Sequence, residues 1–266
     1  MMAERAALEQ FLIWIFLAAI NLQTAYASEG FTLNERLKNT RAVNLETIIE
    51  EQFEAAEAAR GFRVADPYGQ RATKIVSSWS LGKKRDEEVC ALRFVDDSKT
   101  AYELKGFETT AAAVNAGFTI THQGRCGSCS TLQDLSIYLE NPDLTSPARQ
   151  CARRYGLKRK KQCFEENIGF TQYCAESWAY NALHTRQECL GVCIADFGFF
   201  NLVFHRYPGP NNDETGQLRP CLRCDEDNSG AGFKYSAGRT RRNSGIESAI
   251  ERPRSAIYRL EHNDYF

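Results

Sequence analysis

Two cysteines with two residues between them, Cys126 and Cys129, lie in the segment HQGRCGSCS at residues 122–130. The residues before this segment have the character of a strand, and those after it have the spacing of a helix. A thiol at the first turn of a helix faces unpaired backbone amides and the positive end of the helix dipole, and both favour the thiolate. Because a thiolate attacks carbonyl carbons and disulfides, Cys129 is a candidate nucleophile.

The same segment resembles the active-site segment of papain-like cysteine peptidases, in which Gln-Gly-x-Cys-Gly-Ser-Cys is followed by Trp. The resemblance implies that Cys129 is the nucleophile, that Gln123 donates to the oxyanion, and that a structural disulfide holds Cys126. It also implies a peptide or a small acyl compound as the substrate. The chain departs from the family at Ser130, which stands where the family has Trp.

A cysteine hydrolase also needs a histidine that holds the thiolate as an ion pair and protonates the leaving group. His262 follows Cys129 at a spacing that the family accepts, although it lies close to the C-terminus. His205, at the end of the apolar run 199–204, is the alternative base. Cysteine parity weighs against this mechanism, because a free Cys129 requires a second unpaired thiol, for which Cys90 is the natural choice.

Two other interpretations of this motif stay open. In the first, Cys126 and Cys129 form a thiol–disulfide exchange site in which one thiol attacks and the other resolves. In the second, both cysteines are bridged to cysteines elsewhere in the chain, and Gly127 only makes a turn. A second such pair, Cys221 and Cys224, makes zinc binding by four thiols conceivable, but disulfides are favoured in an oxidising compartment.

The beginning of the chain predicts export. Residues 11–22 form an uninterrupted apolar run that follows Arg5 and precedes the small-residue site 25–27, which is the pattern of a signal peptide over residues 1–27. The run is shorter than the roughly 20 residues that a membrane-spanning helix needs, so we expect no stable membrane span after cleavage. Ten cysteines in such a chain predict disulfides and a secreted or lumenal location.

Two polar segments near the end of the chain are candidate binding sites. Arg239, Arg241 and Arg242 form a basic loop whose guanidinium groups could bind a carboxylate, phosphate or sulfate. Just before it, Asp225, Asp227 and Ser229 have the ligand spacing of the first half of a calcium loop, so calcium is a possible cofactor. This calcium signal is weak, because Ser236 stands where such a loop needs a bidentate Glu.

The overall charge excludes one class of partner. Without Glu4, Arg5 and Glu9 of the predicted signal peptide, the chain has 32 basic and 32 acidic residues, and this balance does not indicate nucleic-acid binding. Three functions follow from the motifs: a cysteine-centred hydrolase, a non-catalytic disulfide-rich binding protein for calcium or an anionic ligand, and a thiol–disulfide exchange protein.

The elements that must position these residues follow from hydrophobic periodicity. We expect an amphipathic helix over 40–60, short strands within 62–106, and one further strand over 117–121 that leads into the cysteine motif. The strands at 89–95 and 101–104 form a hairpin around the turn 96–99, and residues 74–76 also have strand character. Helices are expected at 131–139, 146–156, 171–184 and 186–205. The predicted fold class is α+β, a small, mainly antiparallel sheet with a helical, disulfide-rich second half, in a single domain over residues 28–266.

Overall fold

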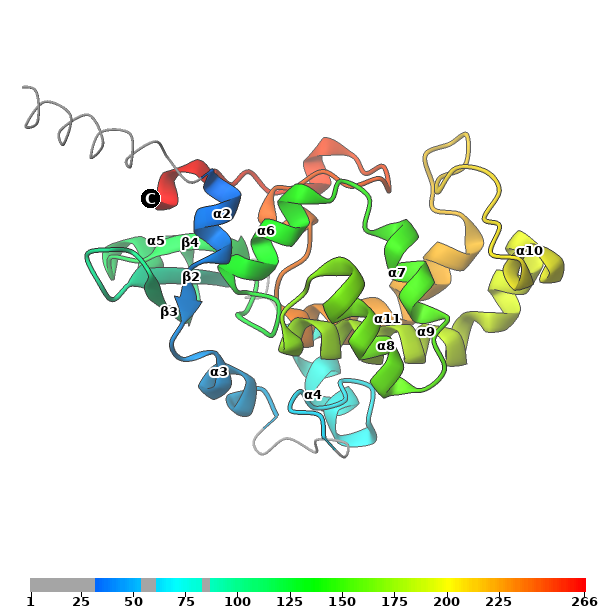
Figure 1. Cartoon of the computed structure of the whole chain (residues 1–266), viewed down its shortest axis with the longest axis horizontal. Helices are drawn as coiled ribbons and strands as arrows, with labels where there is room; N and C mark the ends of the chain where they lie inside the picture. Colours follow the sequence, from blue (N-terminus) through cyan, green and yellow to red (C-terminus); the bar gives the residue numbers. More distant parts are fainter. Residues whose placement is uncertain (1–31, 54–60, 83–86) are drawn as a thin grey trace, which may run out of the picture. The chain divides into compact units, whose positions relative to one another are not determined.

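The structure, a computed structural model, describes residues 32–53, 61–82 and 87–266 (Figure 1). The chain divides into two units, Met1–Arg36 and Leu37–Phe266. The described residues of the first unit begin helix α2 (Leu33–Lys38), where the Glu35 carboxylate accepts a hydrogen bond from the Thr32 amide at 2.8 Å. The predicted signal peptide lies outside the described residues. All the elements discussed below belong to the second unit.

A four-stranded sheet has the order β1 (Arg41–Ala42), β3 (Ala101–Phe107), β2 (Val89–Phe94) and β4 (Thr119–Gln123). Strands β2 and β3 form the predicted antiparallel hairpin, with Leu92 opposite Leu104. Its turn forms because the Asp96 carboxylate accepts the Thr100 amide at 2.9 Å. Strand β4 is antiparallel to β2, and the short β1 is parallel to β3. The predicted fold class, α+β with a small and mainly antiparallel sheet, is confirmed.

Helices make up the rest of the unit, and Figure 1 shows most of them grouped away from the sheet. Their bounds are α3 (Leu45–Glu51), α4 (Gln70–Leu81), α5 (Thr110–Asn115), α6 (Leu132–Glu140), α7 (Thr145–Ala152), α8 (Leu157–Cys163), α9 (Gln172–Phe197), α10 (Phe199–Val203) and α11 (Pro220–Ala237). The two longest, α9 and α11, pack against each other. Among the described residues, no helix has both the length and the apolar character that crossing a membrane requires.

Three sequence predictions differ from the observed elements. The strand predicted at 74–76 is wrong, because these residues lie in α4, where Ala72 and Val76 share one buried helical face. The helix predicted over 40–60 is limited to α3 within the described residues, and it follows strand β1. The helices predicted at 171–184 and 186–205 are largely one continuous helix, α9, which ends before Gly198.

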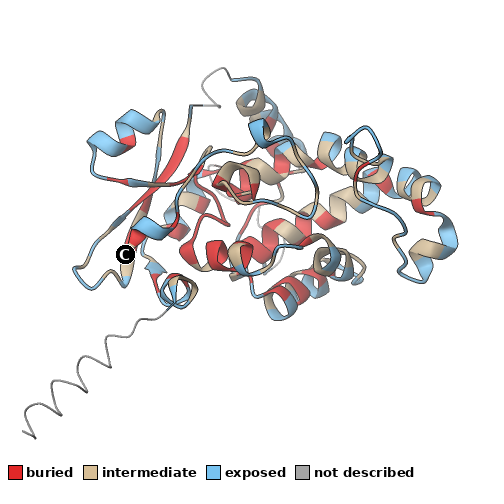
Figure 2. Cartoon of the chain, turned by 90° about the horizontal axis from the view of Figure 1, so that it is seen from above, coloured by how far each residue is buried: buried red, intermediate tan, exposed pale blue. Residues whose placement is uncertain are grey.

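Five disulfides pair all ten cysteines. Two of them, Cys189–Cys224 and Cys193–Cys221, tie α9 to α11 at positions one helical turn apart. A third joins α7 to α8, and the other two hold the cysteine motif. Burial follows this arrangement (Figure 2): the N-terminal half of α9 is largely buried, and its C-terminal half is largely half-buried or exposed. The predicted disulfide-rich character of the chain is confirmed.

Candidate functional site

The cysteine segment, residues 122–130, holds no free thiol. Cys129 is bonded to Cys174 of α9, and Cys126 is bonded to Cys90 of β2. Cys129 is therefore no nucleophile in this structure, and Cys90 is not the unpaired thiol that the hydrolase mechanism requires. The exchange site is also absent, because Cys126 and Cys129 are not bonded to each other. The interpretation in which both cysteines are bridged elsewhere is the one that the structure bears out.

Backbone amides of this segment also have hydrogen-bond partners within the protein. The amides of Ser128 and Cys129 donate to the carbonyls of Ser236 and Ala237, at 2.9 and 2.8 Å, where α11 ends. A Cβ atom on Gly127 would lie 2.5 Å from the Ser236 carbonyl oxygen, so only glycine fits at this close approach. Amides that could have stabilised a thiolate or an oxyanion instead join the segment to α11.

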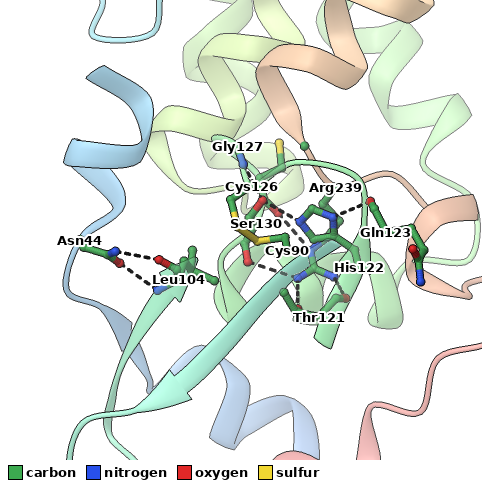
Figure 3. Close-up of a disulfide and its surroundings, with 12 residues drawn as sticks. Asn44, Cys90, Leu104, Thr121, His122, Gln123, Cys126, Gly127, Ser130 and Arg239 are labelled. Carbon is green, nitrogen blue, oxygen red and sulfur yellow. Dashed lines mark hydrogen bonds between the residues drawn. A yellow bond between two sulfur atoms is a disulfide. The ribbon is translucent and has the colours of Figure 1, made fainter. Parts of the chain in front are cut away.

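A buried serine–histidine pair lies in the same segment (Figure 3). The Ser130 hydroxyl accepts the Gly127 amide at 2.8 Å and lies 2.7 Å from Nε2 of His122. Nδ1 of His122 lies 2.9 Å from the Gln123 carbonyl, which can only accept, so Nδ1 carries the proton and Nε2 accepts from Ser130. Burial lowers the pKa of His122 well below its usual value, which keeps the ring neutral. Both residues are 0 % exposed, so no substrate can reach them, and the pair serves the fold.

The residues predicted to assist Cys129 lie in unrelated surroundings. His262 is buried, with Nε2 at 2.7 Å from the Ser244 carbonyl and Nδ1 at 2.8 Å from the Tyr265 hydroxyl. His205 follows α10 and lines a cavity to which Cys129 does not contribute. Gln123 participates through its backbone carbonyl, which accepts the Asn243 side-chain amide at 2.7 Å. The structure does not bring these side chains together with Cys129, so the catalytic arrangement inferred from the resemblance is wrong.

The three arginines of the predicted anion-binding loop also separate. Arg239 is fully buried and donates five hydrogen bonds, to the carbonyls of Thr121, Cys129 and Ser130 and to the hydroxyls of Thr121 and Ser244. Arg242 forms an ion pair with Glu226 at 2.9 Å. Arg241 alone lines the cavity that contains His205. The predicted three-arginine clamp is therefore absent.

The predicted calcium loop is part of helix α11. Asp225 and Ser229 are one turn apart and contact Thr185 of α9, and Asp227 is exposed. Residues two apart on a helix point to nearly opposite sides, so the three side chains cannot surround one ion. No group of three or more metal-ligating side chains occurs among the residues that the structure describes. Pro220 at the first turn of α11 was the sequence signal for this helix.

A cavity of about 680 Å³ is enclosed mainly by α7, α9, α10, α11 and the segment 240–250. Apolar and aromatic side chains form most of its lining, including Ala148, Trp178, Ala182, Ile194 and Phe233. Trp178 lies among three aromatic rings, stacked on Phe170 and in contact with Phe164 and Phe233. The volume and the apolar lining are typical of sites that bind small organic molecules.

Several polar groups of this lining lack well-aligned partners. Nε of Arg153 is buried without a hydrogen-bond partner among the described residues. The Tyr138 hydroxyl and the Trp178 indole nitrogen are also buried, and they make at best a poorly aligned contact with each other. Arg241 is buried, and its guanidinium donates to the carbonyls of Asn141 and Glu247, the latter at 3.0 Å. Burial lowers the pKa of Arg241 from its ordinary value. The lining therefore combines a large apolar area with a few polar atoms whose hydrogen-bonding capacity is unused.

Sequence reasoning missed most of this lining. Its residues come from seven segments between Tyr138 and Ile250, and their proximity depends on the packing of helices rather than on any local motif. One local signal was present: Thr145, Ala148, Arg149, Ala152 and Arg153 recur at helical spacing along α7 and line the cavity together.

Comparison with known proteins adds one match. Residues 157–260 match the model of a family of unknown function (DUF8771), a segment that runs from α8 through α11. No curated protein and no solved structure matches the chain. The matched family is not the papain-like peptidases, and the match does not include the cysteine segment. Together with the disulfides of Cys126 and Cys129, this overturns the assignment to the papain-like family.

Proposed function

We propose that this chain is a secreted, non-catalytic binding protein whose helical half holds a small apolar molecule. The observation that carries the proposal is the 680 Å³ cavity with its apolar and aromatic lining. Transfer of an alkyl chain from water into such a lining contributes about 0.8 kcal/mol for each methylene group that is buried. No thiol chemistry is available to compete with this role, because all ten cysteines are paired.

The disulfides support both the location and the role. Five bridges persist only in an oxidising compartment, which agrees with the predicted signal peptide and with a secreted or lumenal protein. Cys193–Cys221 contributes both of its residues to the cavity lining, and Cys189–Cys224 lies one turn away. These two bridges tie together α9 and α11, two of the helices that line the cavity.

Exposed aromatic residues beside the cavity also favour an apolar ligand. Phe199 and Val203 of α10 belong to the lining, and both are partly exposed. On the same short helix and just after it, Phe200 is 73 % exposed and Phe204 is 63 % exposed. Exposed apolar patches of this kind mark surfaces that meet other apolar molecules.

The test is binding of Nile red, a neutral dye that fluoresces in apolar surroundings, to the full secreted chain. We expect saturable binding to one site. Ala182→Phe places a large side chain in the cavity lining and should weaken binding about tenfold or more, because it removes space that the dye occupies. Ala195→Phe is the matched control, since Ala195 is exposed on the same helix and does not line the cavity.

Melting curves and circular dichroism establish that each variant is folded before its binding is compared. If Ala182→Phe does not fold, Ala148→Leu replaces it as a smaller change at a lining residue of α7. The proposal is overturned if the wild type does not bind the dye, or if a folded cavity variant binds it as tightly as Ala195→Phe does.

A further inference from the structure

The charged groups of the cavity are unbalanced. Four arginines, Arg149, Arg153, Arg186 and Arg241, belong to the described lining, against one carboxylate, that of Asp225. Asp225 already accepts a hydrogen bond from Thr185, and burial raises its pKa. Arg241 is buried and Arg149 and Arg153 are half-buried, whereas Arg186 is exposed. Removing a charge from water costs free energy that a partner must offset, so the first three arginines favour a bound anion. The lining is therefore short of negative charge.

Arg149 belongs to α7, and Arg153 is the C-cap residue that follows the helix with helical backbone angles. Arg149 and Arg153 are four residues apart, which places them on the same face of the helix, one turn from each other. Arg149 lies over the rings of Phe197 and Tyr207 and donates to the Asn211 side chain at 3.2 Å. This stacking holds its guanidinium in place while leaving part of its hydrogen-bonding capacity unused.

Arg153 has fewer contacts still. Its Nε is buried without a partner, and no hydrogen bond or ion pair involves its side chain among the described residues. No carboxylate of the described residues lies within ion-pair distance of Arg149 either. Two like charges on adjacent turns repel each other, and an anion bound between them would remove that repulsion.

We propose that the molecule held in the cavity is a single-chain amphiphile with a carboxylate head, bound by the guanidinium groups of Arg149 and Arg153. This inference rests on the proposed function and specifies its ligand. The apolar lining accommodates the alkyl chain, and Arg241 adds positive charge on the segment 240–250. A free phosphate or sulfate would leave the apolar lining unused, and a neutral lipid would leave the arginines unpaired. Only a ligand with an alkyl chain and an anionic head fits both the apolar lining and the unpaired arginines.

The experiment compares two competitors for bound Nile red, laurate and lauryl alcohol, which share one alkyl chain and differ in the charge of the head. We expect laurate to displace the dye about tenfold more effectively, because hydrogen bonds to a charged group are the stronger ones. Arg153→Gln should reduce this preference, and Arg149→Gln combined with Arg153→Gln should abolish it. The affinity for lauryl alcohol should change much less than the affinity for laurate in both variants, because the alcohol has no charged head for the guanidinium groups to bind.

Arg154→Gln is the matched control, because Arg154 is exposed beside Arg153 and does not line the cavity. It should keep the preference for laurate in full. Equal displacement by laurate and lauryl alcohol in the wild type overturns this inference and leaves the proposed function intact. A preference for laurate that survives in the double variant also overturns it. Failure of both competitors and of the dye to bind overturns the proposed function itself.

Discussion

The cysteine segment and the cavity both lie within residues 37–266, yet they differ in how their polar groups are satisfied. Around the cysteine segment, Arg239 alone makes five hydrogen bonds, and the backbone amides of Ser128 and Cys129 are both paired. Two buried atoms there, Nε of Arg125 and Oε1 of Gln52, have no partner among the described residues. In the cavity lining, Nε of Arg153 is buried without a partner among the described residues, and the polar atoms of Tyr138 and Trp178 make at best a poorly aligned contact with each other.

This difference separates structural from functional polar groups. A buried network in which nearly every group is paired, such as the one around Arg239, contributes to stability and fixes one arrangement of the chain. Unpaired buried polar atoms cost stability, and folds retain few of them unless a ligand completes their hydrogen bonds. The segment with the strongest sequence signal for chemistry is thus the structural one, and the region without such a signal has the features of a binding site.

Replacing Arg239 should produce the largest loss of stability. Arg239→Met leaves three backbone carbonyls and two hydroxyls without a donor, and we expect unfolding free energy to fall by about 4 kcal/mol or more. Guanidinium denaturation measures this loss, and Arg239→Lys should restore only part of it. Gln123→Ala is the control, with a change of about 0.5 kcal/mol or less, because the structure uses this residue through its backbone. A mild effect of Arg239→Met would contradict the structural role of the segment.

Removing one disulfide from each region should separate stability from binding. The double variants Cys129→Ala/Cys174→Ala and Cys193→Ala/Cys221→Ala should each lose about 3 kcal/mol of unfolding free energy, because each releases a loop of the unfolded chain. Only the second should also weaken Nile red binding, because its cystine forms part of the cavity lining. Denaturation curves and dye titrations on the same samples provide the comparison. Loss of dye binding in the folded first variant would show that the two regions are not independent.

The paired network should also make stability depend on pH. Burial lowers the pKa of His262 to about 4, against about 6.5 in an unfolded chain, so between these values the unfolded state binds a proton that the folded state does not. Stability contributed by the neutral ring is therefore complete above pH 6.5 and is lost as the pH falls towards 4, with a slope of up to about 1.4 kcal/mol per pH unit.

His122 acts with the same sign, and Asp134, whose pKa burial raises to about 6, acts with the opposite sign. The difference between wild type and His262→Asn isolates the contribution of His262. We expect the variant to be less stable at pH 7.5 and the gap to narrow steadily down to pH 4, as measured by denaturation at several pH values. A gap that is constant with pH would mean that the ring does not titrate as its burial implies.

Part of this structure could be predicted from the sequence. The elements predicted correctly are those with clear hydrophobic periodicity and clear turn residues. The hairpin of β2 and β3 and helix α6 have clear periodicity and clear turn residues, and both are where the sequence places them. Helix α4 was missed because Ile75 and Val76 are β-branched and favour a strand locally, whereas Val76 packs in a buried cluster with Tyr235 as part of a helix. Helix α11 was missed because its acidic, Gly-containing sequence is typical of a turn.

The site could be predicted far less well than the fold. Spacing does not determine which cysteines pair, so the sequence could not show that Cys126 joins Cys90 rather than Cys129. The catalytic hypothesis depended on that pairing. The cavity depends on contacts between helices that are distant in the sequence, and unpaired atoms such as Nε of Arg153 become visible only when all neighbours are placed.

Replacing a buried tyrosine by phenylalanine should have opposite effects on unfolding free energy in the two regions. This is the smallest effect that we expect to separate them. Tyr102 of β3 is buried, and its hydroxyl accepts the Leu132 amide at 2.7 Å, so Tyr102→Phe should lower unfolding free energy by about 1–3 kcal/mol. Tyr138 is equally buried, but among the described residues its hydroxyl has at best a poorly aligned contact with the Trp178 indole nitrogen. Tyr138→Phe should therefore raise the stability of the ligand-free protein by up to about 1 kcal/mol, since it removes an unsatisfied polar atom without leaving a void. Urea denaturation of both variants measures whether each substitution raises or lowers the free energy of unfolding. A clear loss of stability in Tyr138→Phe would mean that this hydroxyl is already satisfied, and the cavity would then resemble the cysteine segment.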